Sequence, residues 1–143
     1  AAAEVTHAFL KDALLRNKKV FAICHSEGSM NVGLAVKKLS KDLNKNLQAN
    51  LYINAYGTPF PLGRANGREV INYVNQADYV YILGSTFKAI TFPAINTENA
   101  DTKPLPSDHL FSNLAGAGDH AFNGKNYSGM LSENGRKYSN KYL

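Results

Sequence analysis

The 143-residue sequence contains a single cysteine, Cys24, so it cannot form an internal disulfide framework. It holds no apolar run long enough to span a membrane, and its N-terminus does not resemble a secretory signal. One cysteine and four well-separated histidines leave no spacing typical of a metal site, so we expect neither a metal nor a cofactor. Hydrophobic residues make up 44% and charged residues 19%, which excludes the disordered class and predicts one globular domain over residues 1–143.

Sixteen Lys and Arg against eleven Asp and Glu give a net charge of +5, which suits nucleic acid or an anionic membrane surface. These basic residues are scattered, and most fall where a helix would show its solvated face, so their pattern does not favour nucleic acid as a partner. The chain begins at Ala1 without a methionine, as a processed product or the C-terminal fragment of a longer chain would.

Helix-like and strand-like patterns alternate along the first half of the chain. The predicted helices are Glu4–Asn17, with Val5, Phe9, Ala13 and Leu14 at helical spacing, and Glu27 to about Leu43; the predicted strands are Val20–Cys24, Asn50–Tyr56 and Glu69–Val74. Because the first strand is apolar throughout, we expect it to be covered on both faces in a parallel sheet. The pattern predicts a small α/β domain with at least three mainly parallel strands flanked by helices.

The first strand runs directly into Ser26, and a helical pattern begins immediately after it. A strand that becomes a helix across one residue places that residue in a strained turn, with its side chain exposed at the strand's carboxyl end. Small neighbours are expected two positions to either side, and they are Cys24 and Gly28. The alternative interpretation is an ordinary helix N-cap, which serine also favours.

A serine hydroxyl becomes a nucleophile when a histidine removes its proton and a carboxylate orients that histidine. Asp78 follows the third strand, and parallel strands would bring it to the same edge of the sheet as Ser26. Two histidines come later, and we prefer His120, which lies in a glycine-rich loop, to His109 as the base. His25 is expected to point to the opposite face from Ser26, and Cys24 is expected to be inert packing.

Three motifs occur in an order that is similar to that of class 3 (fungal-type) lipases. The first is Cys24-His25-Ser26-Glu27-Gly28, which resembles the G-x-S-x-G elbow with its first glycine replaced. The second is Tyr52 to Pro59, a strand that runs into a Gly-Thr-Pro turn, and the third is Val70 to Val80, a strand that leads to Asp78-Tyr79-Val80. The chain also resembles the lipase-like C-terminal domains of bacterial polymorphic toxins. The resemblance implies an α/β-hydrolase-like domain, with the Glu27 amide as an oxyanion-hole donor and a second donor from elsewhere.

The expected function is therefore serine-dependent hydrolysis of a carboxylic ester, of the lipase or phospholipase type, through Ser26, His120 and Asp78. The resemblance implies a lipid or small ester substrate, contact with a membrane surface, an immunity-type protein partner, and secretion or delivery as a bacterial effector. Gly84 to Pro106 is interpreted as irregular loop, and its apolar part, Phe87 to Ile95, as a rim or lid over the site. Two alternatives stay open: an inactive hydrolase-fold binding module, and a basic toxin domain that attacks nucleic acid.

Overall fold

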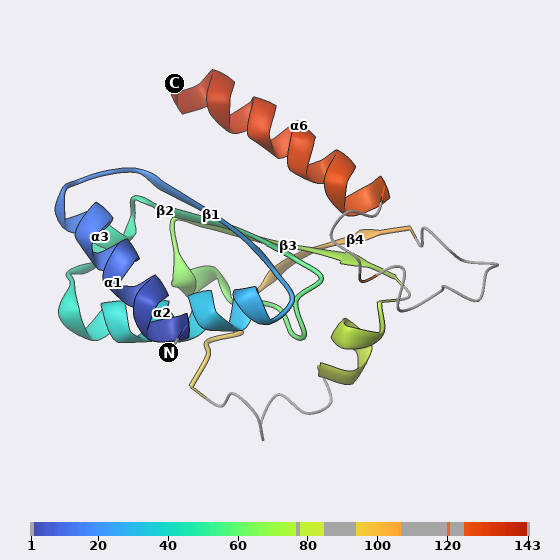
Figure 1. The fold of residues 1–143 in the computed structure, drawn as a ribbon, viewed down its shortest axis with the longest axis horizontal. Coiled ribbons are helices and arrows are strands. Elements are labelled where there is room, and N and C mark those ends of the chain that lie inside the picture. Colours follow the sequence, from blue (N-terminus) through green and yellow to red (C-terminus); the bar gives the residue numbers. More distant parts are fainter. Residues whose placement is uncertain (1, 77, 85–93, 107–119, 121–124, 143) are drawn as a thin grey trace.

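The fold is an α/β domain built on a four-stranded, all-parallel sheet (Figure 1). The computed structural model describes residues 2–76, 78–84, 94–106, 120 and 125–142. In chain order its elements are α1 (Ala2–Leu15), β1 (Val20–His25), α2 (Glu27–Asp42), α3 (Lys45–Gln48), β2 (Leu51–Tyr56), the 3-10 turn η1 (Arg64–Asn66), β3 (Glu69–Asn75), β4 (Asp101–Leu105) and α6 (Lys125–Tyr142). A short helical segment over residues 79–84 follows β3. The predicted fold class, a parallel sheet flanked by helices, is confirmed.

The strand order is β1-β2-β3-β4, so the three strands predicted from the sequence are neighbours in space. Val20 pairs with Leu51 and His25 with Tyr56 across β1 and β2, and Tyr56 pairs with Tyr73 across β2 and β3. The carboxyl ends of β1, β2 and β3 therefore lie at one edge of the sheet. This alignment brings together the segments that follow the three strands, as open parallel sheets commonly do at their ligand sites.

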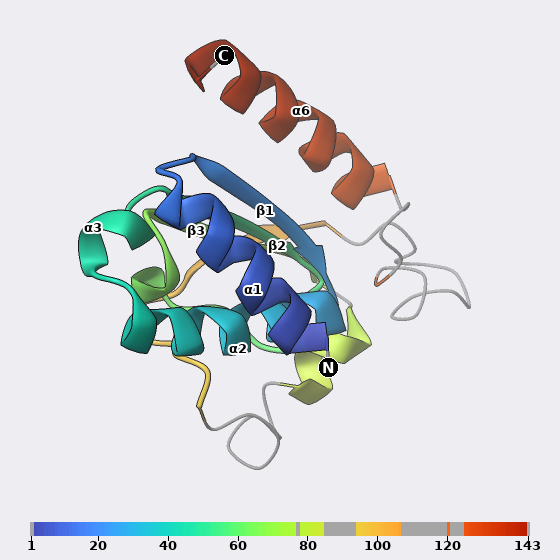
Figure 2. The ribbon, with the colours of Figure 1, turned by 60° about the vertical axis from the view of Figure 1, so that its left-hand side comes forward.

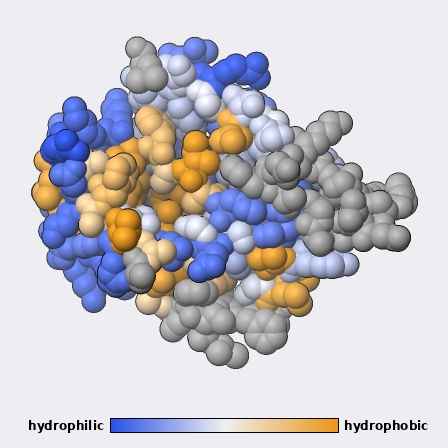
Figure 3. Space-filling model, viewed as in Figure 1, coloured by the Kyte–Doolittle hydropathy of each residue, from blue (hydrophilic) through white to orange (hydrophobic). Residues whose placement is uncertain are grey.

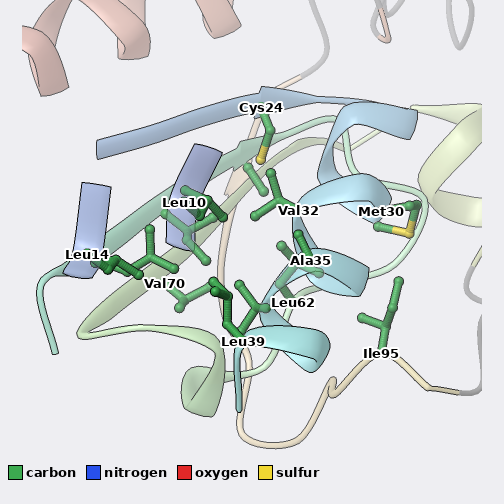
Figure 4. Close-up of a cluster of buried hydrophobic side chains, with 14 of the residues drawn as sticks. Leu10, Leu14, Cys24, Met30, Val32, Ala35, Leu39, Leu62, Val70 and Ile95 are labelled. Atoms are coloured by element: carbon green, nitrogen blue, oxygen red, sulfur yellow. The ribbon is translucent and has the colours of Figure 1, made fainter. Parts of the chain in front are cut away.

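Helices cover both faces of the sheet (Figures 1 and 2). Because successive side chains of a strand point to opposite faces, each strand packs against the helices on both. Helices α1 and α2 pack on one face with Leu51, Ile53 and Ala55 of β2, which form the main core with Leu10, Leu14 and Leu39 (Figure 4). Helix α6 lies over the other face, where Tyr127 packs with Tyr56, Ile71 and Tyr73. Every residue of β2 is buried as a result.

Helix α1 buries only part of the stripe that was predicted for it. Leu10, Ala13 and Leu14 are buried, whereas Val5 is 71% exposed and Phe9 is also exposed. Figure 3 shows hydrophobic side chains gathered over the region of α1 and β1 on the face it draws. The predicted stripe is wrong at Val5 and Phe9, because the face of α1 that packs on the domain passes through Leu10 and Leu14 and leaves these two side chains outside it.

Strand β1 lies at the edge of the sheet, not within it. The prediction that both faces are covered is wrong, because only Cys24 in this strand is buried and Ile23 is 52% exposed. An apolar edge strand cannot be distinguished from a central strand by sequence, because hydrophobic composition does not show how many strands pair with it.

The stretch interpreted as irregular loop contains the fourth strand. Strand β4 pairs with β3 through Ile71–Asp101 and Asn75–Leu105. Its sequence, Asp-Thr-Lys-Pro-Leu, has no apolar alternation, and a proline inside a strand is tolerated only at an edge. The nearby Ile95 is buried in the main core, so it does not belong to an apolar rim; the rest of that predicted lid, residues 87–93, lies outside the described residues.

Candidate active site

Ser26 forms the whole junction between β1 and α2. Its backbone has φ 53° and ψ −127°, a conformation that costs a residue with a Cβ of the order of 1–3 kcal/mol. The Ser26 N–H donates to Tyr56 O at 3.1 Å, which extends the β1–β2 ladder into the turn. The serine hydroxyl makes no capping hydrogen bond to α2, so the N-cap interpretation does not account for this side chain.

The hydroxyl of Ser26 instead contacts a histidine that lies 94 residues further along the chain. Ser26 Oγ is 2.8 Å from His120 Nε2, and His120 Nδ1 is 3.0 Å from both carboxylate oxygens of Asp78. Since a carboxylate only accepts, His120 Nδ1 donates to Asp78, and in the neutral form of the ring the lone pair on Nε2 faces the serine. The three side chains therefore stand in the order and tautomer that proton removal from Ser26 requires.

Asp78 is fully buried, and its carboxylate has donors on several sides. Oδ1 accepts from the Val80 N–H at 2.9 Å, so Asp78 caps the helical segment over residues 79–84. Oδ2 accepts from the Tyr127 hydroxyl at 2.8 Å, and that hydroxyl accepts from the Asn75 N–H at 3.0 Å. Tyr127 thus links the acid to α6 and to the end of β3.

Burial by itself raises the pKa of Asp78, because it removes water from the charged form. Hydrogen bonds from His120, Tyr127 and the Tyr81 N–H, together with the charge of His120, outweigh burial and hold the pKa of Asp78 below its usual value. The aspartate is therefore ionised at neutral pH and can stabilise positive charge on His120.

Gly57, the residue after β2, lies against the side chains of Asp78, His120 and His25. Its φ is +54°, and a Cβ placed there would lie 3.0 Å from Asp78 Oδ2, 3.1 Å from His120 Nδ1 and 3.2 Å from His25 Nε2. A side chain here would be strained by the positive φ and would crowd these three atoms, so glycine suits both the conformation and the space. The sequence identified Gly57 as part of a turn but gave no signal that it touches the acid and the base.

His25, which was expected to point away from the serine hydroxyl, contacts His120. His25 Nε2 lies 2.6 Å from the main-chain oxygen of His120, and the two imidazole rings are 4.7 Å apart at a tilt of 34°. Burial lowers the pKa of His25 and the charge of His120 adds to this, while the hydrogen bond to His120 and the charge of Asp78 raise it; the net shift is downward. His25 is therefore neutral at pH 7.

Cys24 and Gly28 pack less tightly than a nucleophile elbow was expected to require. A Cβ on Gly28 would lie 3.9 Å from the Cys24 Cβ, which is ordinary van der Waals contact. The turn therefore accommodates cysteine at the position of the first glycine. Burial raises the pKa of the Cys24 thiol to about 11, which makes it a poor nucleophile at neutral pH.

Glu27 is the first residue of α2, so its N–H has no partner within the helix and lies beside Ser26. It meets the positional requirement of one oxyanion donor.

His109, the alternative base, lies outside the described residues. Within the described part of the chain, no three His, Cys, Asp or Glu side chains gather as a metal site would require, and no helix is long and apolar enough to cross a membrane.

Comparisons with protein-family models, with curated proteins and with solved structures find no significant match to this chain. The resemblance to class 3 lipases therefore depends on the order of the three motifs.

Proposed function

We propose that the protein is a serine hydrolase of carboxylic esters, with Ser26 as nucleophile, His120 as base and then acid, and Asp78 as the residue that orients His120. The observation that carries the proposal is the continuous contact from Ser26 Oγ through His120 to Asp78, at 2.8 and 3.0 Å. These residues come from three segments separated by 52 and 42 positions, a convergence that sheet packing alone does not require. The strained φ of Ser26 supports the same interpretation, since strain of this kind concentrates at functional sites.

The reaction follows from the proton positions. Ser26 Oγ attacks the ester carbonyl carbon while its proton passes to His120 Nε2, and the Glu27 N–H stabilises the oxyanion that forms. His120 then gives that proton to the departing alkoxide, which leaves the acyl group on Ser26. A water molecule, deprotonated by His120, attacks the acyl carbon and releases the carboxylic acid and the free serine.

The proposed substrate class is lipid, of the lipase or phospholipase type. The helical segment that begins after Asp78 exposes Tyr79, Ile82 and Leu83, each at least half exposed. The Ile82 N–H donates to the Asp78 main-chain oxygen at 3.1 Å, which fixes this apolar surface to the residue that carries the acid. An apolar rim beside a hydrolytic serine suits an acyl chain or a membrane surface. Delivery as a toxin or effector, with an immunity-type partner, is part of the same proposal.

A catalytically inactive binding module is the second candidate, and one observation favours it. Strand β1 lies at the sheet edge, and the described residues form no earlier strand beside it that could contribute a second oxyanion donor. A nucleic-acid-targeting domain has less support, because several basic side chains are paired with acids: Lys38 with Glu4, Lys11 with Asp42 and Arg16 with Asp12.

A fluorophosphonate probe distinguishes the two main candidates. The proposal predicts one adduct on Ser26 by intact-mass and peptide analysis, no adduct in Ser26→Ala, and an unchanged adduct in Ser40→Ala, a matched change on the exposed surface of α2. Asp78→Asn should slow labelling on the order of 10⁴-fold, because the histidine tautomer is no longer fixed. A folded protein that hydrolyses neither short-chain esters nor phospholipid vesicles and takes up no probe would refute the enzyme and favour the binding module.

A further inference from the structure

His25 and Ser26 hold His120 at two different places. Ser26 Oγ lies 2.8 Å from the tip of the His120 ring, and His25 Nε2 lies 2.6 Å from the main-chain oxygen of the same residue. Consecutive side chains of a strand point to opposite faces, and the positive φ of Ser26 then redirects the serine at the end of β1. One dipeptide therefore contacts both the reactive nitrogen and the backbone of His120.

The contact with His25 has a defined direction. A carbonyl oxygen only accepts, so His25 Nε2 must carry the proton that it donates. The ring of His25 also lies 4.7 Å from the ring of His120 and 6.2 Å from that of Tyr127, which donates to the acid. A Cβ at Gly57 would come within 3.2 Å of His25 Nε2, so the glycine leaves the space in which this hydrogen bond forms.

We infer that His25 is a positioning residue, which sets the distance between the base and the nucleophile by anchoring the main chain of His120. His25 moves no proton in this role. The inference rests on the proposed function, since it concerns the geometry of the same Ser26–His120 pair. Proton transfer between them depends steeply on the approach of the two heavy atoms, and a displacement of about 1 Å in an active site lowers the rate on the order of 100-fold.

Two substitutions separate the hydrogen bond from the space that the side chain fills. In His25→Gln an amide N–H can replace the ring Nε2 donor, whereas His25→Leu fills similar volume without a donor. His7→Leu on α1 is the matched control, because His7 bonds Asp42 far along the chain from the site. The measurements are the rate of fluorophosphonate labelling, kcat and KM with a short-chain ester, and thermal unfolding of each variant.

We expect His25→Leu to lower kcat and the labelling rate on the order of 100-fold with KM nearly unchanged, because ground-state binding is untouched. His25→Gln should recover most of that loss, and His7→Leu should match the wild type. Proton NMR gives a readout independent of turnover: the low-field Nδ1–H resonance of His120, assigned by its loss in Asp78→Asn, should shift or broaden in His25→Leu and return in His25→Gln.

The results also distinguish failure of this inference from failure of the proposed function. If the wild type takes up no probe, the hydrolase is refuted, and the NMR comparison alone then decides whether His25 positions His120. If the wild type is labelled and folded His25→Leu is labelled within about threefold of the same rate, with an unchanged His120 resonance, the positioning role is refuted. Equal losses in the leucine and glutamine variants would also refute it, since they would indicate a requirement for the ring and not for the donor.

Discussion

The backbone of Ser26 has a conformation that glycine adopts freely and residues with a Cβ do not. At φ 53° and ψ −127° the strain is of the order of 1–3 kcal/mol. Replacing Ser26 by alanine or by glycine removes the same hydroxyl and its contact with His120, so that loss cancels when the two variants are compared. The comparison isolates the backbone, and glycine should give the more stable protein although neither variant can be labelled.

The size of the difference follows from two opposing effects. Glycine relieves the strain, but it also gives the unfolded chain more freedom, which costs about 0.4–1 kcal/mol. The net advantage of Ser26→Gly over Ser26→Ala should be roughly 0–2.6 kcal/mol in the free energy of unfolding, centred near 1.3 kcal/mol. Ser26 is also the N-cap residue of α2, a position at which glycine is favoured over alanine, so the measured difference is the sum of strain relief and this N-cap preference.

Urea unfolding followed by circular dichroism at 222 nm measures this difference, with m values checked for equality. Ser40, on the exposed surface of α2, is the control position because its backbone is helical. There the sign should reverse, with Ser40→Gly less stable than Ser40→Ala by about 1 kcal/mol. If Ser26→Gly is no more stable than Ser26→Ala, the elbow is not strained, and one of the two observations behind the nucleophile assignment is lost.

Three further predictions concern the residues around Ser26. Gly57→Ala should abolish ester hydrolysis and cost about 1–3 kcal/mol in urea unfolding, whereas Gly28→Ala should stay within about 0.5 kcal/mol; equal effects would contradict the close packing at Gly57. The lowered pKa of Asp78 means that the unfolded chain binds the proton first as the pH approaches about 3.9. Wild-type stability should therefore drop more steeply than that of Asp78→Asn between about pH 5 and 3; parallel curves would oppose this. With its pKa near 11, Cys24 should be about one part in 1,000 thiolate at pH 8 and react with a disulfide reagent only on unfolding, and rapid reaction of the folded protein would contradict its burial.

Local sequence was sufficient for the elements that carry their own hydrophobic pattern. Helix α2 and strands β1, β2 and β3 were predicted within one or two residues, because their apolar residues recur at the period of the structure they form. Strand β4 lacks such a pattern and exists through its pairing with β3, so only the structure identifies it. The edge position of β1 was missed for a related reason, since strand order depends on contacts between distant segments.

The candidate site divides in the same way. Ser26 and Asp78 could be proposed because each follows a recognisable strand, and a turn or a strand end leaves a local signal. The roles of Tyr127 and His25 were not predicted, because their contacts with Asp78 and His120 span 49 and 95 residues and, unlike the contact of His120 with Ser26, match no known motif order. The alternation that separates His25 from Ser26 does carry a usable signal: it places His25 on the face that α6 covers, where aromatic residues gather.

The site residues also satisfy structural requirements of the fold, and this explains how their positions can be fixed so closely. Asp78 caps the segment over residues 79–84 with Oδ1, one of the two oxygens that face His120, so the backbone N–H of Val80 holds the carboxylate in place independently of His120. Tyr127 fixes the second oxygen while packing in the core beneath α6. Ser26 differs, because its conformation costs stability and its hydroxyl makes no capping hydrogen bond. A strained residue beside two that are stabilised by their surroundings is the arrangement that the proposed chemistry at Ser26 predicts.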